Sequence, residues 1–422
     1  MEHKDHLIKD SMILFIASTV VNLANFVFHS YASRLLGPEQ YGVLVTLLAL
    51  IIIVGMPAMA LQMTIVKKTS IFKAHGRFGS VEKLFKKTIL WFSVLGALYF
   101  VVFAAAGSGI GGLKDFFHIE DAFLYYILGG IAFVSLMVTV VRGILQGLQK
   151  FIGLGATMIT DAVIRLIFLF IFVSVLSWGA RGALATTFVG TATAFVLGLV
   201  LISYIFRYKE SSAEVIRKRD VFSYALPVFF SMMGFALLSY MDVFMVKHFF
   251  SSYEAGLYSA TSMIGKAFLY FPSAIVVTLF PKVAESHELN KNTMSLLTKS
   301  LGLTALISLA GIIICFFFPK IIIAVMFGEK FLAIEGVVKF FGAAILPLVL
   351  YNVLLNYSLA VHKYGFIFIM YAGIVVYAAV LWFFHGSFYQ VVTVLFAVNM
   401  VILLLSFVSL YFEKKKVSHE VP

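Results

Sequence analysis

Polar side chains recur at helical spacing inside a long apolar segment near the start of the chain. Ser18, Asn22, Asn25, His29 and Ser33 follow one another at steps of three or four residues. An α-helix returns to the same face at this interval, so these side chains would form one continuous stripe. In hydrocarbon such a stripe must face another helix or a water-filled cavity, which makes it a candidate binding surface.

Three further apolar segments carry the same pattern, and each of them includes charge. Small polar residues also hold membrane helices together, at about 0.6 kcal/mol each. Four long stripes, three of them charged, exceed what helix packing requires, so the sequence favours a hydrophilic cavity. The three further stripes are Ser135, Thr139, Arg142, Gln146 and Gln149; Thr157, Asp161 and Arg165; and Ser259, Ser262, Lys266, Tyr270 and Ser273.

The charged residues differ in whether their own helix offers a partner. Asp161 and Arg165 are four residues apart and can neutralise each other, whereas Arg142, Lys266 and Asp242 have no such neighbour. Lys266 lies near the middle of its segment, where a charge costs about 2.5–3.5 kcal/mol. Its compensation is either an anionic group of a substrate or a carboxylate of another helix, such as Asp242. Asp242 in turn either carries a coupling ion or pairs with a cation.

These considerations give two sets of candidate residues and no catalytic or metal-ligating set. Arg142 lies nearer the cytoplasmic end, where its head group can also reach water along the lipid. The candidate substrate-binding residues are Asn22, Asn25, His29, Arg142, Gln146, Arg165, Lys266 and Tyr270. The candidate ion-coupling residues are Asp242 and Asp161.

The elements that must position these residues are membrane-spanning helices. Apolar residues make up 62% of the chain and charged residues 12%, with a mean hydropathy of +1.02. A soluble domain is nearer half apolar and a quarter charged. Each predicted span is close to the ~20 residues that a bilayer requires. The twelve predicted spans are 11–33, 41–66, 88–106, 121–146, 152–176, 182–206, 221–246, 255–280, 297–318, 334–360, 364–385 and 388–412.

The twelve segments consist of two sets of six, and the second set repeats the first. LLGPEQYGVLVTL around Gly42 corresponds to FFSSYEAGLYSAT around Gly256, and at nearly the same offset Pro57 corresponds to Pro272. Two six-helix units in the same orientation are a transporter plan with the site between the halves. We therefore expect an all-α membrane protein with lobes at 1–210 and 211–422. Prolines inside the spans are typical of helices that bend at a gate, although a static kink is as common.

The net charge of +12 is distributed as in a membrane protein rather than a nucleic-acid binder. Lys and Arg concentrate in alternate connections, seven of them between Lys67 and Lys87. This asymmetry predicts that both termini and that connection are cytoplasmic. A nucleic-acid surface would need basic residues interleaved with aromatic ones outside the spans, so we expect no nucleic-acid partner.

Motifs of enzyme chemistry are missing from the sequence. There is no HExxH, and Gly265-Lys266 is followed by Ala267 rather than by the Ser or Thr of a phosphate-binding loop. We expect no enzymatic activity and no cofactor. A transporter without a nucleotide-binding motif must then draw on a proton or sodium gradient, or on consumption of the transported molecule outside.

Two signatures give the chain a family resemblance. SRLLGPEQYG after the first span and YMDVFMVKHFFSSYEAGLYSAT across the seventh and eighth resemble motifs of the Wzx-type polysaccharide flippases, in the multidrug/oligosaccharidyl-lipid/polysaccharide exporter superfamily. The resemblance covers essentially the whole chain. It implies a two-lobed fold with a cationic central cavity that faces alternate sides of the plasma membrane. It also implies a polyprenyl-diphosphate oligosaccharide as substrate, with glycosyltransferases and a glycan polymerase as partners. Asp242 matches the Asp of the motif.

A second function class stays open. The multidrug branch of the superfamily (MATE) shares this fold and relies on acidic cavity residues, a role for which Asp161 or Asp242 would be needed. The basic residues without a partner on their own helix favour the flippase. The lipid II flippases usually have two further spans, which counts against that assignment.

Overall fold

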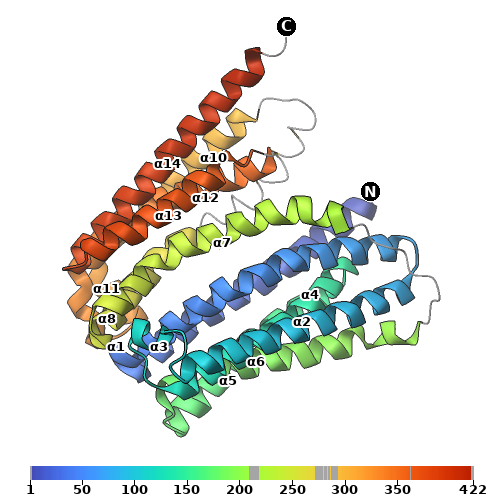
Figure 1. Ribbon diagram of the computed structural model, residues 1–422, viewed down its shortest axis with the longest axis horizontal. Helices are drawn as coiled ribbons and strands as arrows, with labels where there is room; N and C mark the ends of the chain where they lie inside the picture. Colours follow the sequence, from blue (N-terminus) through green and yellow to red (C-terminus); the bar gives the residue numbers. More distant parts are fainter. Residues whose placement is uncertain are drawn as a thin grey trace. The chain divides into compact units, whose positions relative to one another are not determined.

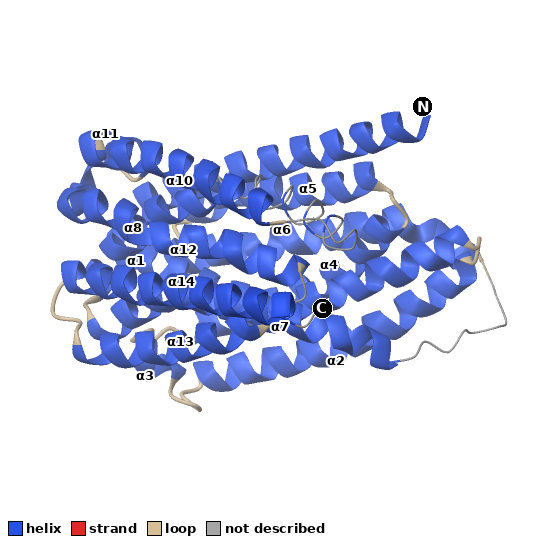
Figure 2. Cartoon of the chain, turned by 90° about the horizontal axis from the view of Figure 1, so that it is seen from above, coloured by secondary structure: helices blue, strands red, loops and turns tan. Residues whose placement is uncertain are grey.

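The computed structural model is helical throughout the part of the chain that it describes, and strands are absent from these residues (Figure 2). Its contacts divide into two compact units, Met1–Phe229 and Phe230–Pro422, and the division falls inside helix α7. The described residues are 2–208, 218–270, 293–361 and 363–419, together with Leu279, Val283 and Ser286. The side chains of 2–11, 60, 218–225, 268–270 and 411–419 are not among the described ones.

The N-terminal unit begins with α1 (Glu2–Ala74), a 73-residue helix that contains the first two predicted spans. It departs from helical geometry at Gly37, where φ is 69° and ψ is 175°. Glycine adopts a positive φ without the steric cost of a side chain, and Pro38 then suits the first turn of the second half. The other helices of this unit are α2 (Phe78–Gly107), α3 (Leu113–Phe117), α4 (Ala122–Gly147), α5 (Phe151–Leu169) with a π-helical end η1 (Phe170–Val175), and α6 (Gly179–Ile202) with a 3₁₀ end η2 (Ser203–Arg207).

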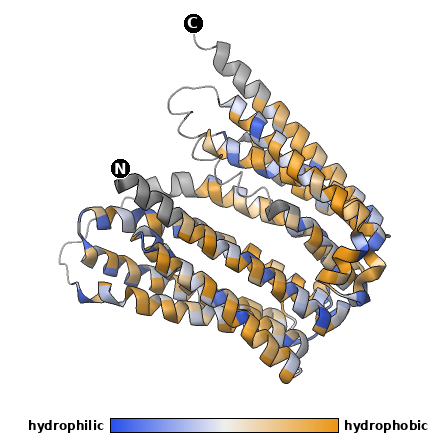
Figure 3. Cartoon of the chain, turned by 180° about the vertical axis from the view of Figure 1, so that it is seen from behind, coloured by the Kyte–Doolittle hydropathy of each residue, from blue (hydrophilic) through white to orange (hydrophobic). Residues whose placement is uncertain are grey.

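Helix α4 is the central element of the N-terminal unit. It packs against α1, α2 and α6, and 67% of its most apolar window is buried, against 22% for α2 and 17% for α5 with η1. The outer faces of α2 and α5 are apolar and exposed, as expected for helices in contact with lipid tails (Figure 3). Residues on the inner face of α4 are therefore held by neighbours on several sides.

The C-terminal unit repeats this plan. Its central helix α12 packs against α8, α10 and α14, and the span that contains it has the same 67% buried share. The helices of this unit, seen in Figure 1, are α7 (Lys218–Phe249), α8 (Ser252–Tyr270), α10 (Met294–Phe317), α11 (Pro319–Met326), η3 (Glu329–Ile334), α12 (Glu335–Ala360), α13 (Gly365–Phe383) and α14 (Phe388–His419).

The predicted all-α membrane fold is confirmed, while the count of twelve spans stays a prediction. Ten described helices are long and apolar enough to cross a bilayer, and the first of these, Met12–Ala74, covers two predicted spans. The predicted span 255–280 runs beyond α8 into residues outside the described part. The sequence did not predict the short helices α3, α11 and η3, because each is too short to show a helical period.

Candidate functional site

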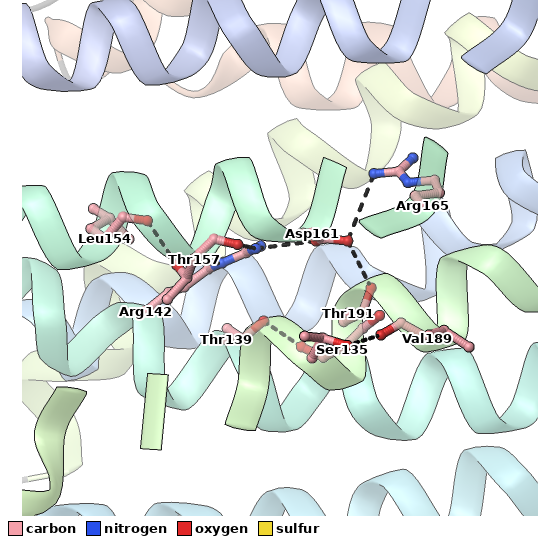
Figure 4. A network of polar contacts seen from close by, with 10 residues as sticks. Ser135, Thr139, Arg142, Leu154, Thr157, Asp161, Arg165, Val189 and Thr191 are labelled. Carbon is pink, nitrogen blue, oxygen red and sulfur yellow. Dashed lines mark hydrogen bonds and ion pairs between the residues drawn. The ribbon is translucent and has the colours of Figure 1, made fainter. Parts of the chain in front are cut away.

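Two helices of the N-terminal unit bring three charged side chains together. Arg142 of α4 lies against α5, and its Nη2 is 3.1 Å from Asp161 Oδ2. Arg165, one turn further along α5, has its Nη2 3.8 Å from the other oxygen, Oδ1 (Figure 4). The three side chains are between 13% and 21% exposed, so water neutralises little of their charge. One carboxylate is shared by two guanidinium groups, and the cluster carries a net charge of +1.

Hydroxyl and carbonyl groups fix this cluster in place. Arg142 donates from Nη2 to the Thr157 carbonyl at 3.2 Å and from Nε to Thr157 Oγ1 at 3.4 Å. Thr191 of α6 donates to Asp161 Oδ1 at 3.4 Å. The sequence stripes did not include Thr191. The pair Thr187 and Thr191, one turn apart in an apolar helix, was the signal that could have found it.

Arg165 is the less closely paired of the two arginines, at 3.8 Å from Asp161 against 3.1 Å for Arg142. Its guanidinium carbon lies 5.5 Å from the centroid of the Phe28 ring on α1, a favourable position for a cation. Its buried Nε has no hydrogen-bond partner among the described residues. Buried donors are nearly always paired in native proteins, and an exception indicates a bound water, an ion or a ligand.

A cavity of about 360 Å³ opens beside the cluster, inside the N-terminal unit. Most of its wall is apolar, and the segment of α1 between Ile51 and Met59 contributes the largest share. Its polar wall is contributed by α4, α5 and α6. The polar wall residues are Ser135, Thr139, Arg142, Asp161 and Thr191, to which Tyr99 of α2 adds a hydroxyl.

The close approach of α5 and α6 at Gly190 holds Asp161 in place. A Cβ atom at residue 190 would lie 2.6 Å from the Asp161 carbonyl oxygen and 3.0 Å from its Oδ1. We predict that Gly190→Ala forces the two helices apart and lowers Tm by about 2–4 °C or more. Gly302→Ala is the matched control, since nothing lies within 4 Å of its Cβ position. Thermal unfolding in detergent measures both, and equal Tm values for the two variants would contradict the prediction.

The other predicted substrate-binding residues of this unit lie away from the cavity wall. His29 Nδ1 is 3.2 Å from the Tyr41 hydroxyl, within α1. Asn25 is half-buried and Asn22 is exposed, one and two turns before His29. Gln146 accepts a hydrogen bond from Gln62 at 3.4 Å, which joins α4 to α1.

In the C-terminal unit Asp242 and Lys266 form a buried ion pair. Asp242 of α7 is fully buried, and its Oδ2 accepts from Tyr258 at 3.2 Å and Ser262 at 3.0 Å. Lys266 Nζ is 3.8 Å from Oδ1 and 4.1 Å from the centroid of the Tyr240 ring. Of the two compensating groups that the sequence left open for Lys266, the structure provides the carboxylate.

The sequence stripes did not include the two tyrosines of this second cluster. Tyr258, Ser262 and Lys266 follow at steps of four along α8, so the stripe could have been extended by one turn from Ser262 back to Tyr258. Tyr270 was predicted to bind substrate, and its side chain lies outside the part that the structure describes.

A family model matches the part of the chain that contains both clusters. Residues 7–287 match the family model described as polysaccharide biosynthesis protein. The chain belongs to this family. An uncharacterised membrane protein of Methanocaldococcus jannaschii is 24% identical over 332 residues, which cover 75% of each chain.

Solved structures with similar folds are transporters of the MOP superfamily. An inward-facing multidrug resistance MATE family transporter aligns over 96% of both chains with a TM-score of 0.79 at 12% identity. The lipid II flippase MurJ in an inward closed conformation aligns over 96% of this chain and 87% of its own, with a TM-score of 0.68 at 13% identity. This member of the polysaccharide biosynthesis family is therefore a multi-pass membrane protein with the fold of a MOP transporter.

Proposed function

We propose that this protein moves polyprenyl-diphosphate-linked oligosaccharide across the cytoplasmic membrane by alternating access, for the synthesis of surface polysaccharide. One observation carries the proposal: the cluster of Arg142, Asp161 and Arg165 keeps a net positive charge beside a cavity among membrane helices. Charged groups at this depth are costly and usually mark a substrate path.

The chemistry of the cluster suits a diphosphate. A diphosphate brings several negative charges that must leave water, and a confined cation offsets that cost. The planar guanidinium group binds phosphate oxygens in a bidentate manner, which an ammonium cannot do. Arg142 is at the cavity wall, and the Nε of Arg165 has no hydrogen-bond partner in the part of the chain that the structure describes, so both have capacity for an anion beyond Asp161.

The size of the cavity limits which part of the substrate it holds. A volume of about 360 Å³ is near the lower end of the ~300–1,000 Å³ typical of drug-sized ligands. We assign the diphosphate to this cavity and the saccharide to the polar residues Asn22, Asn25, His29 and Gln146 of the same unit. Amide and hydroxyl groups form the hydrogen bonds that sugar hydroxyls offer.

The alternative, a MATE-type antiporter for organic cations, requires a carboxylate that is available to the substrate. Asp161 faces two guanidinium groups, and Asp242 faces the Lys266 ammonium. A cationic drug would have to displace these internal cations, so the geometry supports an anionic substrate.

Transport in proteoliposomes tests the proposal, with a fluorescent polyprenyl-diphosphate saccharide in one arm and an organic cation in the other. We expect the protein to accelerate exposure of the saccharide on the opposite leaflet and to leave the rate of cation transport unchanged. The lipid should be recovered unchanged, because no bond is made or broken. Proton-gradient-driven movement of the cation, without movement of the lipid, would instead establish the antiporter.

We further propose that both termini and the connection around His75 are cytoplasmic. Nine basic residues lie in the connections of the N-terminal unit near His75, Lys150 and Arg207. A bias of this kind sets the orientation of a protein in the membrane. With Cys315 replaced by alanine, a cysteine at position 75 should react with an impermeant thiol reagent only after the cells are opened. A cysteine at position 110, at an exposed Ile, should react in intact cells. The reverse pattern would overturn this topology. The nine residues are Lys67, Lys68, Lys73, Arg77, Lys83, Lys86, Lys87, Lys150 and Arg207.

A further inference from the structure

The ion pair in the C-terminal unit has the composition of a cation site that is already filled. We propose that the Lys266 ammonium is a built-in cation that occupies the position beside Asp242, so that the Asp242 site binds no sodium or other metal cation. The inference concerns ion specificity and holds whichever solute the protein carries.

The groups around Asp242 are oxygen ligands of the kind that hard cations prefer. Besides the two carboxylate oxygens, the hydroxyls of Tyr258 and Ser262 lie within 3.2 Å of Oδ2. The Tyr377 hydroxyl of α13 interacts electrostatically with the same carboxylate, is fully buried, and has no hydrogen-bond partner among the described residues. Oxygen atoms of α7 and α8 thus meet in one small, buried region.

The two oxygens of Asp242 have different partners. Oδ2 accepts both hydroxyl hydrogen bonds, while Oδ1 is buried without a hydrogen bond and faces Lys266 Nζ at 3.8 Å. The face of the Tyr240 ring lies on another side of the same ammonium, at 4.1 Å. A carboxylate and an aromatic face together form a favourable environment for a monovalent cation.

The balance of charge excludes a second cation. Asp242 is fully buried and Lys266 is 7% exposed, so one positive and one negative charge compensate each other out of contact with water. A sodium ion added here would leave an uncompensated buried charge, which is strongly unfavourable. Lys247 of α7 is also buried, and it donates to Ser252 Oγ at 2.9 Å.

Removal of the lysine head group should convert the pair into a sodium site. Thermal unfolding of the whole protein in nanodiscs is measured with NaCl titrated against choline chloride at constant ionic strength. We expect no sodium-specific change for the wild type. For Lys266→Met we expect a saturable rise in Tm of about 2 °C or more, because a sodium ion that binds only the folded state stabilises that state. Asp242→Asn in the same background should remove that rise.

Lys339→Met is the matched control, because it also breaks a Lys–carboxylate pair, with Glu335 at 3.2 Å, but at a site about one-third exposed. This variant should gain no sodium response. A sodium-specific rise in the wild type that Asp242→Asn abolishes would overturn the proposal, and that arm decides even if Lys266→Met does not fold. Lys266→Gln is the second variant, and a folded Lys266→Met or Lys266→Gln without any sodium response would equally overturn it.

Discussion

Replacing Arg142 with alanine is expected to reduce transport of the lipid-linked oligosaccharide by about 30-fold or more while the protein stays folded. Truncating one partner of a buried, hydrogen-bonded charge pair costs about 2–5 kcal/mol of binding, and each 1.4 kcal/mol is a factor of ten. Folding should survive, because Asp161 keeps Arg165 as a counter-ion at 3.8 Å. The initial rate in proteoliposomes, corrected for the amount of inserted protein, measures the effect.

Two control variants separate charge, shape and simple loss of an arginine. Arg142→Lys keeps the charge but loses the planar fork, so it should retain an intermediate rate. Arg181→Ala removes an arginine that pairs with Asp121 and is 57% exposed, so its rate should be close to that of the wild type. An Arg142→Ala rate within twofold of the wild type would remove the cluster from the substrate path.

Replacing Asp161 with alanine is expected to destabilise the N-terminal unit by about 3–5 kcal/mol, since it leaves buried charge uncompensated. Arg142 and Arg165 would then lie in the same apolar surroundings without their shared carboxylate. The yield of inserted protein and its Tm should both fall. The double variant Asp161→Ala/Arg165→Leu should recover part of the lost stability, because it removes one of the two cations.

The same residue distinguishes the two transport classes. If Asp161 were the proton carrier of an antiporter, Asp161→Asn would fold normally and lose only its dependence on the gradient. We expect instead that Asp161→Asn is less stable than the wild type at every imposed gradient. A stable Asn variant with uncoupled transport would contradict the structural role assigned to Asp161.

Helical periodicity predicted most of the charged residues in the clusters, but it did not predict the pairs that join two different helices. The stripes on α4 and α5 contained Arg142 and Asp161, and the spacing of four predicted the contact of Asp161 with Arg165. The contact of Arg142 with Asp161 depends on the register of two different helices, and a helical period carries no information about that register. For the same reason Arg142, Lys266 and Asp242 had no partner on their own helix, and the pairing of Lys266 with Asp242 stayed one of two alternatives.

The internal repeat predicted two similar units, yet equivalent residues of the repeat do different work. In the N-terminal unit Gln40 accepts a hydrogen bond from the Ala180 backbone at 3.0 Å, at the start of α6. The equivalent Glu254 accepts from the Ser251 backbone at 3.1 Å and closes a capping box at the start of its own helix α8. The alignment of the halves shows the change from amide to carboxylate, but it does not show the local turn that decides which helix end each side chain caps.

Equilibrium binding of a polyprenyl diphosphate to the protein in nanodiscs tests the central claim most directly. The wild type and Arg142→Ala are compared on the diphosphate, on the corresponding monophosphate and on the uncharged polyprenol. The structure predicts that the wild type binds the diphosphate most tightly, that Arg142→Ala weakens this binding by at least about 30-fold, and that binding of the uncharged lipid is unaffected by the substitution. Equal affinity of the wild type for diphosphate and polyprenol, or an unchanged diphosphate affinity in Arg142→Ala, would contradict the account.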